Sequence, residues 1–316
     1  MRRRALVLLL ASAAALAAAG AASADSGGLL PPTPESPNAD AVRDVYVVGL
    51  VVAALVFAAL VGALVTFVAR RGTRTPEPAP AAEPRSGLLA FAGAAVVLAV
   101  LLGFTAYKLP DILDAPAADA AGETRIVVEA HQFYWLFRYP NNVVSINEMV
   151  APAETVVHLE VTAPATDVVH SWWVPQLGAK VDAAPGRTNE TWFKANGGTY
   201  TARCAELCGL QHAVMDGSVR VVPHERYVEF LNTGIEEAAL GKQEFEGVCL
   251  TCHKLDQPFI GPPLAGATAL SDRDQLERIV REGVRTMPAV GSTWSDDQID
   301  ALYAHTGELE ADAGEG

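Results

Sequence analysis

The 316-residue chain is short of cysteine and of basic residues. Four cysteines are too few for a disulfide scaffold in a chain of this length. Lysine and arginine together number 23 against 37 aspartates and glutamates, which gives a formal net charge of −14. This acidic balance argues against nucleic acid or an anionic membrane surface as the main partner. It favours a basic protein partner or simple solubility.

Apolar residues are abundant and lie apart from the acidic ones. Half of the residues are hydrophobic and the mean hydropathy is +0.21, which is unusual for a single acidic globule. Residues 1–109 carry a net charge of +3, whereas residues 110–316 carry −17. The length indicates about two domains with additional segments. We therefore divide the chain near residue 109 into an apolar part and an acidic part.

The first 24 residues have the pattern of a secretory signal peptide. Three arginines open the chain, an apolar run follows, and Ala22-Ser23-Ala24 has the small residues of a cleavage site. The alternative is an uncleaved first membrane helix. With cleavage after Ala24, residues 25–44 become an outer N-terminal segment.

Two long apolar runs predict a pair of transmembrane helices. Val45–Ala69 has 25 residues without a charge, and Ser86–Tyr107 has 22. Each exceeds the roughly 20 residues that cross a hydrocarbon core, and a buried helix of a soluble protein is rarely apolar on every face for so long. We place the helices at residues 45–69 and 86–109.

The loop between these helices sets their orientation. Residues 70–85 hold four arginines and two glutamates, and positive loops stay in the cytoplasm. The chain is therefore predicted to be a two-pass protein of a prokaryotic plasma membrane, in contact with lipid. Everything from residue 110 onward would lie on the extracytoplasmic side.

Residues 110–235 read as an all-β domain followed by a linking helix. Short runs of β-branched and aromatic residues are separated by proline, glycine and asparagine, which is typical of a sandwich or barrel. The linking helix is expected at 224–235. The strand candidates are 125–139, 155–161, 168–174, 188–195, 199–203 and 217–222.

A cluster of soft ligands follows the predicted strand at 199–203. Cys204 and Cys208 are four residues apart, His212 comes four later and Met215 three after that, and His170 is a plausible second imidazole. Thiolate, imidazole and thioether together select copper over harder metals, whereas zinc usually takes closer cysteine pairs and no methionine. A disulfide between the two cysteines is the alternative.

This loop resembles the binuclear copper A (CuA) site of cytochrome c oxidase subunit II. The resemblance also covers the helical hairpin, Asp167–Pro175 and Ala183–Arg187, and it implies a cupredoxin fold for about residues 124–223. It further implies a specific ligand set. The copper ligands would be His170, Cys204, Cys208, His212, Met215 and the backbone carbonyl of Glu206, whose side chain would reach a magnesium ion shared with subunit I.

An aromatic run resembles the family's electron-entry patch. Gln132-Phe133-Tyr134-Trp135 corresponds to the family's Gln-Trp-Tyr-Trp. The resemblance implies that electrons enter at Trp135. Phe133 departs from the pattern, which alters the docking surface but leaves the entry residue present. The other interpretation of this run is ordinary strand aromatics. Asp167 is interpreted either as a docking carboxylate or as an exposed loop residue.

The last segment contains a c-type haem attachment pattern. Cys249 and Cys252 would form the two thioether bonds, and His253 would be an axial ligand of the iron. Met287 offers the second axial ligand. The alternative is a methionine that only packs in the core. A Met/His pair raises the haem potential. The resemblance to cytochromes c implies that the carbonyl of Pro262 accepts a hydrogen bond from the His253 ring, which would orient it.

The rest of residues 236–316 is predicted to be helical, as in a small class I cytochrome c. An amphipathic run covers 271–282. Ser295 and Gln298 form a capping box before a second helix, and Gly307 is a predicted stop. The expected fold is thus a two-helix hairpin, an all-β cupredoxin-like sandwich and an all-α cytochrome c.

Together these features predict the electron-entry subunit of a haem–copper cytochrome c oxidase, whose oxygen reduction occurs in subunit I. The expected cofactors are CuA with two coppers, one covalent haem c and the shared magnesium. Subunits I and III and an upstream reductase or soluble cytochrome would be the partners. The alternatives are a free-standing membrane-anchored carrier and a relative of nitrous oxide reductase, while the two cysteines of the copper loop exclude a quinol oxidase subunit.

Overall fold

A computed structural model describes residues 30–71, 84–117 and 123–314. The chain forms two compact units, residues 1–114 and 115–316. The predicted signal peptide and most of the predicted cytoplasmic loop lie outside the described residues, as does the beginning of the outer N-terminal segment.

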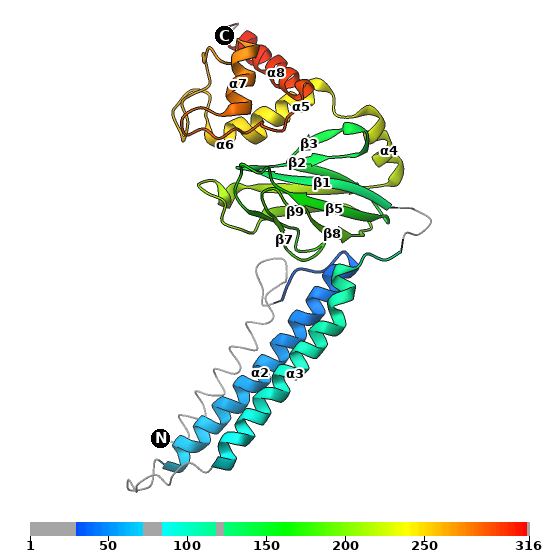
Figure 1. Cartoon of the computed structure of the whole chain (residues 1–316), viewed down its shortest axis with the longest axis vertical. Coiled ribbons are helices and arrows are strands. Elements are labelled where there is room, and N and C mark those ends of the chain that lie inside the picture. The colour runs from blue at the N-terminus through cyan, green and yellow to red at the C-terminus, as the bar shows by residue number, and fades with distance from the viewer. Residues whose placement is uncertain (1–29, 72–83, 118–122, 315–316) are drawn as a thin grey trace. The chain divides into compact units, whose positions relative to one another are not determined.

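The first unit contains two long helices, α2 (Pro37–Arg71) and α3 (Pro84–Leu113), which lie side by side (Figure 1). Lys108, near the end of α3, forms a 2.7 Å ion pair with Asp44, near the start of α2, so the helices run antiparallel. Both are long and apolar enough to cross a membrane, and none of the most apolar stretch of either is buried within the protein. This confirms the predicted apolar hairpin, and each helix extends beyond its predicted span at both ends.

The second unit begins with a sandwich of two five-stranded sheets, ordered β3-β2-β1-β5-β8 and β4-β10-β9-β6-β7 (Figure 1). Strands β1 and β5 are parallel, as are β4 and β10, and the other neighbours are antiparallel. The strands are β1 (Glu123–His131), β2 (Tyr134–Arg138), β3 (Val144–Ile146), β4 (Glu148–Pro152), β5 (Val156–Thr162), β6 (His170–Trp173), β7 (Val181–Ala183), β8 (Asn189–Phe193), β9 (Gly198–Cys204) and β10 (Asp216–Val222).

Alternation along the strands builds the core between the sheets. In β9, for example, Tyr200, Ala202 and Cys204 are buried while the residues between them face outward, which is the period-two pattern of a strand with one wet face. The predicted run 125–139 forms two strands, β1 and β2, and each of the other predicted strands is present. Strands β3, β4 and β7 are additional short strands.

Helices follow the sandwich within the same unit. The predicted linking helix is α4 (His224–Thr233) and ends at Gly234. The cytochrome region then consists of α5 (Glu237–Glu244), a π-helical turn η4 (Phe245–Cys249), α6 (Leu250–Cys252), α7 (Arg273–Glu282) and α8 (Asp296–Gly314). The predicted order of apolar helices, β-sandwich and helical domain is confirmed.

The N-terminus of α8 has the predicted capping box, but the predicted stop is wrong. Ser295 and Gln298 exchange backbone-to-side-chain hydrogen bonds of 3.2 and 3.3 Å. The helix passes through Gly307 and continues to Gly314. A single glycine costs about 1 kcal/mol in a helix. Leu309 packs against the core beyond that point, which favours continuation of the helix.

Candidate copper and haem sites

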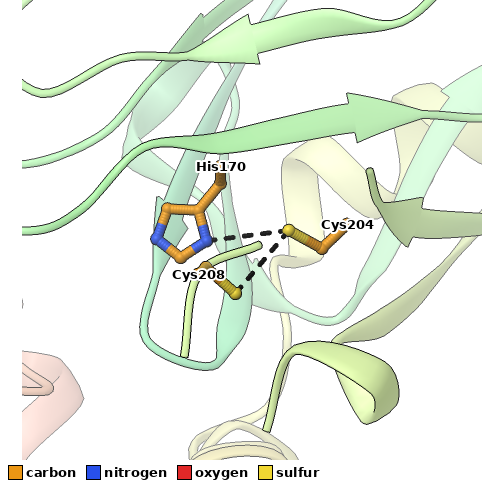
Figure 2. A group of neighbouring side chains, drawn as sticks. All are labelled: His170, Cys204 and Cys208. Carbon is orange, nitrogen blue, oxygen red and sulfur yellow. Dashed lines mark hydrogen bonds between the residues drawn. The ribbon is translucent and has the colours of Figure 1, made fainter. Parts of the chain in front are cut away.

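The predicted copper ligands meet at one end of the sandwich. Strand β9 ends at Cys204, and β6, which begins at His170, pairs with it so that Trp172 lies opposite Cys204. This register brings the imidazole of His170 beside the two thiols although 34 residues separate it from Cys204 (Figure 2). The ligand atoms of His170, Cys204 and Cys208 all lie within 4.8 Å of one another.

The remaining donors of the loop join the same cluster. Sγ of Cys204 is 3.9 Å from Nδ1 of His170, 3.8 Å from Sγ of Cys208 and 3.2 Å from the carbonyl oxygen of Glu206. Sγ of Cys208 lies 3.7 Å from Nδ1 of His212 and 3.8 Å from Sδ of Met215. A disulfide needs an S–S distance of about 2.05 Å, so these cysteines are not bonded to each other.

The cluster is buried, and its thiols differ in acidity. His170 is 0% exposed, Met215 1% and Cys208 3%. The hydrogen bond from Cys208, helped by His170, lowers the pKa of the Cys204 thiol to about 3, while the same contact raises the pKa of Cys208. This lowered pKa favours the thiolate form of Cys204, which is a soft donor. The donor chemistry of the site fits copper.

Asp167 orients the His170 ring. Nε2 of His170 donates to Oδ1 of Asp167 at 3.1 Å, which leaves Nδ1 facing Cys204. The Asp167 side chain is only 12% exposed, so neither a docking carboxylate nor an exposed loop residue describes it. Burial by itself would raise the pKa of Asp167, but the hydrogen bond from His170 lowers it below its usual value. An ionised carboxylate behind a ligating histidine fixes the orientation of the ring and raises its basicity.

Replacing Asp167 with alanine should therefore weaken copper binding by about 10- to 100-fold, because such supporting contacts are typically worth that much in metal affinity. Competition with a copper chelator would measure the change. Asp182→Ala is the matched control, since Asp182 lies exposed on β7. Equal affinities of the two variants would show that Asp167 does not support the site.

Trp135 is fully buried and faces the core of the sandwich. Its ring makes an edge contact with Trp172 at 4.8 Å between centroids and lies 6.3 Å from the ring of the predicted ligand His170. Trp135 therefore presents no surface to a docking protein, and its electron-entry role stays a prediction. The Glu206 side chain, by contrast, is exposed.

The haem attachment turn has the predicted support for its histidine. Nδ1 of His253 lies 2.7 Å from the carbonyl oxygen of Pro262, so this hydrogen bond is present as expected. The contact occupies Nδ1 and leaves Nε2 available for a metal. Gly261 lies flat against the ring, since a Cβ there would come within 2.3 Å of it. The ring orientation and the glycine together fit an axial ligand.

The surroundings of Met287 also fit a haem. Met287 is half-buried in a tight turn in which its backbone pairs with Val284 in both directions, at 3.1 and 2.9 Å. Four large apolar side chains of this region are 44–54% exposed, and a bound haem would cover surface of this kind. They are Leu255, Phe259, Ile260 and Val284.

Two glutamines make supporting contacts that the sequence did not indicate. The Gln132 side chain donates to the carbonyl oxygen of Cys208 at 2.6 Å and so supports the copper loop. The Gln211 side chain donates at 2.8 Å to the carbonyl oxygen of Thr251, which lies between the two haem-attachment cysteines. No local spacing indicates either supporting contact, because both join segments far apart in the chain.

Comparison with known families agrees with this division of the second unit. Residues 143–222 match the family model of the cytochrome c oxidase subunit II periplasmic domain. Residues 236–305 match the model described as cytochrome c oxidase, cbb3-type, subunit III.

Individual relatives carry the same description. The chain is 40% identical to cytochrome c oxidase subunit 2 of Alkalihalophilus pseudofirmus over 139 residues, 40% of each chain. It is 28% identical to the corresponding protein of Cereibacter sphaeroides, covering 67% of this chain and 81% of that one. It therefore spans less than half the length of the first relative and most of the second.

A solved structure matches the sandwich. It is the periplasmic domain of subunit II of cytochrome oxidase from Bradyrhizobium japonicum, at 35% identity over 38% of this chain and 95% of that one, with a TM-score of 0.34. The family models and relatives, together with the ligand cluster and the haem turn, lead to one conclusion. The chain contains a cytochrome c oxidase subunit II periplasmic domain, built on the β-sandwich, followed by a cytochrome c domain.

Proposed function

We propose that this chain is the electron-entry subunit of a haem–copper terminal oxidase, passing electrons from its own haem c through CuA to subunit I, where oxygen is reduced to water. Bound copper and haem would each supply a one-electron redox centre. His170, Cys204, Glu206 (by its carbonyl), Cys208, His212 and Met215 would hold the copper pair. Cys249, Cys252, His253 and Met287 would hold the haem, with Pro262 supporting His253.

The observation that carries the electron route is the contact between the two sites. Gln211 directly precedes the predicted copper ligand His212, and its amide bonds the carbonyl of Thr251 in the haem-attachment turn. A hydrogen bond thus bridges the copper loop and the haem turn. This supports direct transfer between two centres held in one compact unit.

The proposed assembly follows from the same arrangement. The apolar hairpin would pack in a prokaryotic plasma membrane beside subunits I and III, with the sandwich and cytochrome region outside. The exposed Glu206 side chain is free to reach an interfacial magnesium. Electrons would reach haem c from a reductase or a soluble cytochrome.

Purification of the chain from its own membranes in mild detergent tests the assembly. A multi-helix haem protein and cyanide-sensitive oxygen consumption should co-purify with it. A chain that carries copper and haem but is isolated alone would favour the free-standing carrier. The nitrous oxide reductase alternative predicts nitrous oxide reduction by the same preparation.

Salt dependence should separate internal from external electron transfer. Both extracytoplasmic regions are acidic, with net charges of −7 for residues 110–235 and −10 for 236–316, so long-range attraction does not bring them together. We expect the internal haem-to-copper rate to change little with ionic strength, while reduction by a basic external donor slows as salt rises. Stopped-flow rates would show both, and a steep fall in the internal rate would contradict the proposal.

A further inference from the structure

The sandwich contacts the cytochrome region on two sides, at the haem-attachment turn and at the loop between α7 and α8. On the attachment side, the Asn147 amide donates to the carbonyl of Gly247 at 3.2 Å, and the backbone of Ile146 donates to Gln243 at 3.1 Å. Side chains of the two regions also form one shared apolar cluster that includes Leu136 from β2 and Val248 from η4. The cytochrome region is therefore seated on β2 and β3 and is not merely tethered.

The second side involves the loop between α7 and α8. Tyr134 donates to the carbonyl of Val290 and accepts a 2.9 Å hydrogen bond from the indole of Trp294. Arg138 donates to the carbonyl of Thr293 at 2.9 Å, and the Thr293 hydroxyl donates to the carboxylate of Glu129. Val290, Thr293 and Trp294 of this loop are thus each held by a side chain of β1 or β2.

These contacts are buried, and the charged group Glu129 has a partner of opposite charge. Tyr134 is 0% exposed and Glu129 9%. Burial by itself would raise the pKa of Glu129, but the hydrogen bond with His131 and the charge of Arg138 lower it to about 2. The carboxylate is therefore anionic at neutral pH and pairs with Arg138, whose Nε lies 3.3 Å away. Buried, paired contacts of this kind hold a loop more firmly than exposed ones.

The same loop carries Met287. Val290 follows it by three residues and Thr293 by six, and short backbone hydrogen bonds run through the segment, from Val290 to Pro288 at 2.9 Å and from Trp294 to Gly291 at 3.1 Å. A displacement of Val290 would therefore also displace Met287, because hydrogen bonds keep the backbone of this segment compact.

We propose that Tyr134 and Arg138 of the sandwich are positioning residues for Met287, so that docking of the two regions keeps this methionine on the haem iron. The inference rests on the proposed function only for the ligation of haem c by His253 and Met287. It assigns to the sandwich a role in the haem site as well as in copper binding. The partner recognised by this face of β2 is the chain's own cytochrome region.

The test measures how easily Met287 leaves the iron. Imidazole added to the ferric, full-length, copper-loaded chain in detergent can bind only after the methionine has dissociated. Tyr134→Phe removes the hydroxyl but keeps the ring, and Arg138→Leu removes the charge. Because a hydrogen bond is worth about 0.5–1.5 kcal/mol, each variant should bind imidazole about three- to tenfold more tightly. The near-infrared band of methionine-ligated ferric haem should be lost at lower temperature.

Tyr139→Phe is the matched control. Tyr139 is a buried tyrosine of the same sandwich whose hydroxyl bonds Ser145 and Val150, away from this loop. Its imidazole affinity should equal that of the unchanged chain, and all variants should keep the copper EPR signal. Equal imidazole affinity of Tyr134→Phe, Arg138→Leu and the control would overturn the inference. If the unchanged chain binds haem but lacks the methionine band, the ligation itself is refuted, and the inference falls with it.

Discussion

Cys204→Ser is expected to abolish the mixed-valence copper EPR signal while leaving the haem absorption bands intact. Cys204 lies between His170 and Cys208 in the ligand cluster, and its lowered pKa makes it the more readily ionised thiol of the pair. A serine hydroxyl is a hard donor that stays protonated at neutral pH, so it does not replace a bridging thiolate. Only one thiolate would then remain for two copper ions.

The measurement is EPR and copper analysis of the full-length chain after copper loading. Thr201→Ser provides a matched control. Thr201 lies exposed on the same strand β9, and the substitution likewise introduces a serine. The control should keep the signal. A multiline signal that survives in Cys204→Ser would show that the copper pair is held elsewhere, whereas intact haem bands in both variants separate copper loss from misfolding.

Glu244→Gln is expected to stabilise the cytochrome region by about 3 kcal/mol at pH 7. Glu244 on α5 is 0% exposed, and the amide of Gln298 donates to its Oε1 at 3.1 Å. Its other oxygen has no hydrogen-bond partner. Burial raises the pKa of this carboxyl to about 9, so the folded protein keeps it protonated at neutral pH.

The pH dependence of stability shows why this substitution should stabilise the folded state. The unfolded chain releases this proton near the usual glutamate pKa of about 4.5, whereas the folded chain holds it until about pH 9. The folded state therefore binds more protons between these values, and its stability falls as pH rises through that window. Glutamine is neutral throughout and keeps the volume and the acceptor for Gln298, so its advantage should grow with pH up to about 9.

Denaturant unfolding at several pH values between these limits would measure the effect. Glu246→Gln is the control, because that carboxylate is exposed and pairs with Lys242 at 3.9 Å. The gap between Glu244→Gln and the unchanged chain should widen with pH, while the gap for the control stays small. Parallel pH profiles for all three proteins would contradict the assignment of a protonated buried carboxyl.

Local patterns predicted much of this protein. The apolar runs predict α2 and α3 because nothing but length and hydropathy decides a membrane span. Alternation predicts the longer strands, and the capping box predicts the start of α8. The short strands β3, β4 and β7 were not predicted, because three to five residues carry too little periodicity and form strands only beside partners already in place.

The misplaced features share one cause, which is contact with residues distant in sequence. Gly307 does not end its helix, because packing beyond it outweighs its low helix propensity. Asp167 is a largely buried partner of His170, because its side chain points toward that ring from an otherwise exposed loop. Trp135 lies inside the sandwich, although its position in an aromatic run indicated a docking patch.

The sequence by itself predicted most of the copper and haem ligands, because soft donors and haem cysteines stand at fixed short spacings, and it determined the pair of apolar helices. Both the copper region and the haem region are acidic, so their net charges do not indicate how they meet. Only the tertiary structure decided how they meet. Short-range contacts of Tyr134, Arg138 and Gln211 hold them together, and such contacts leave no trace in local spacing because their partners lie 40 to 156 residues away.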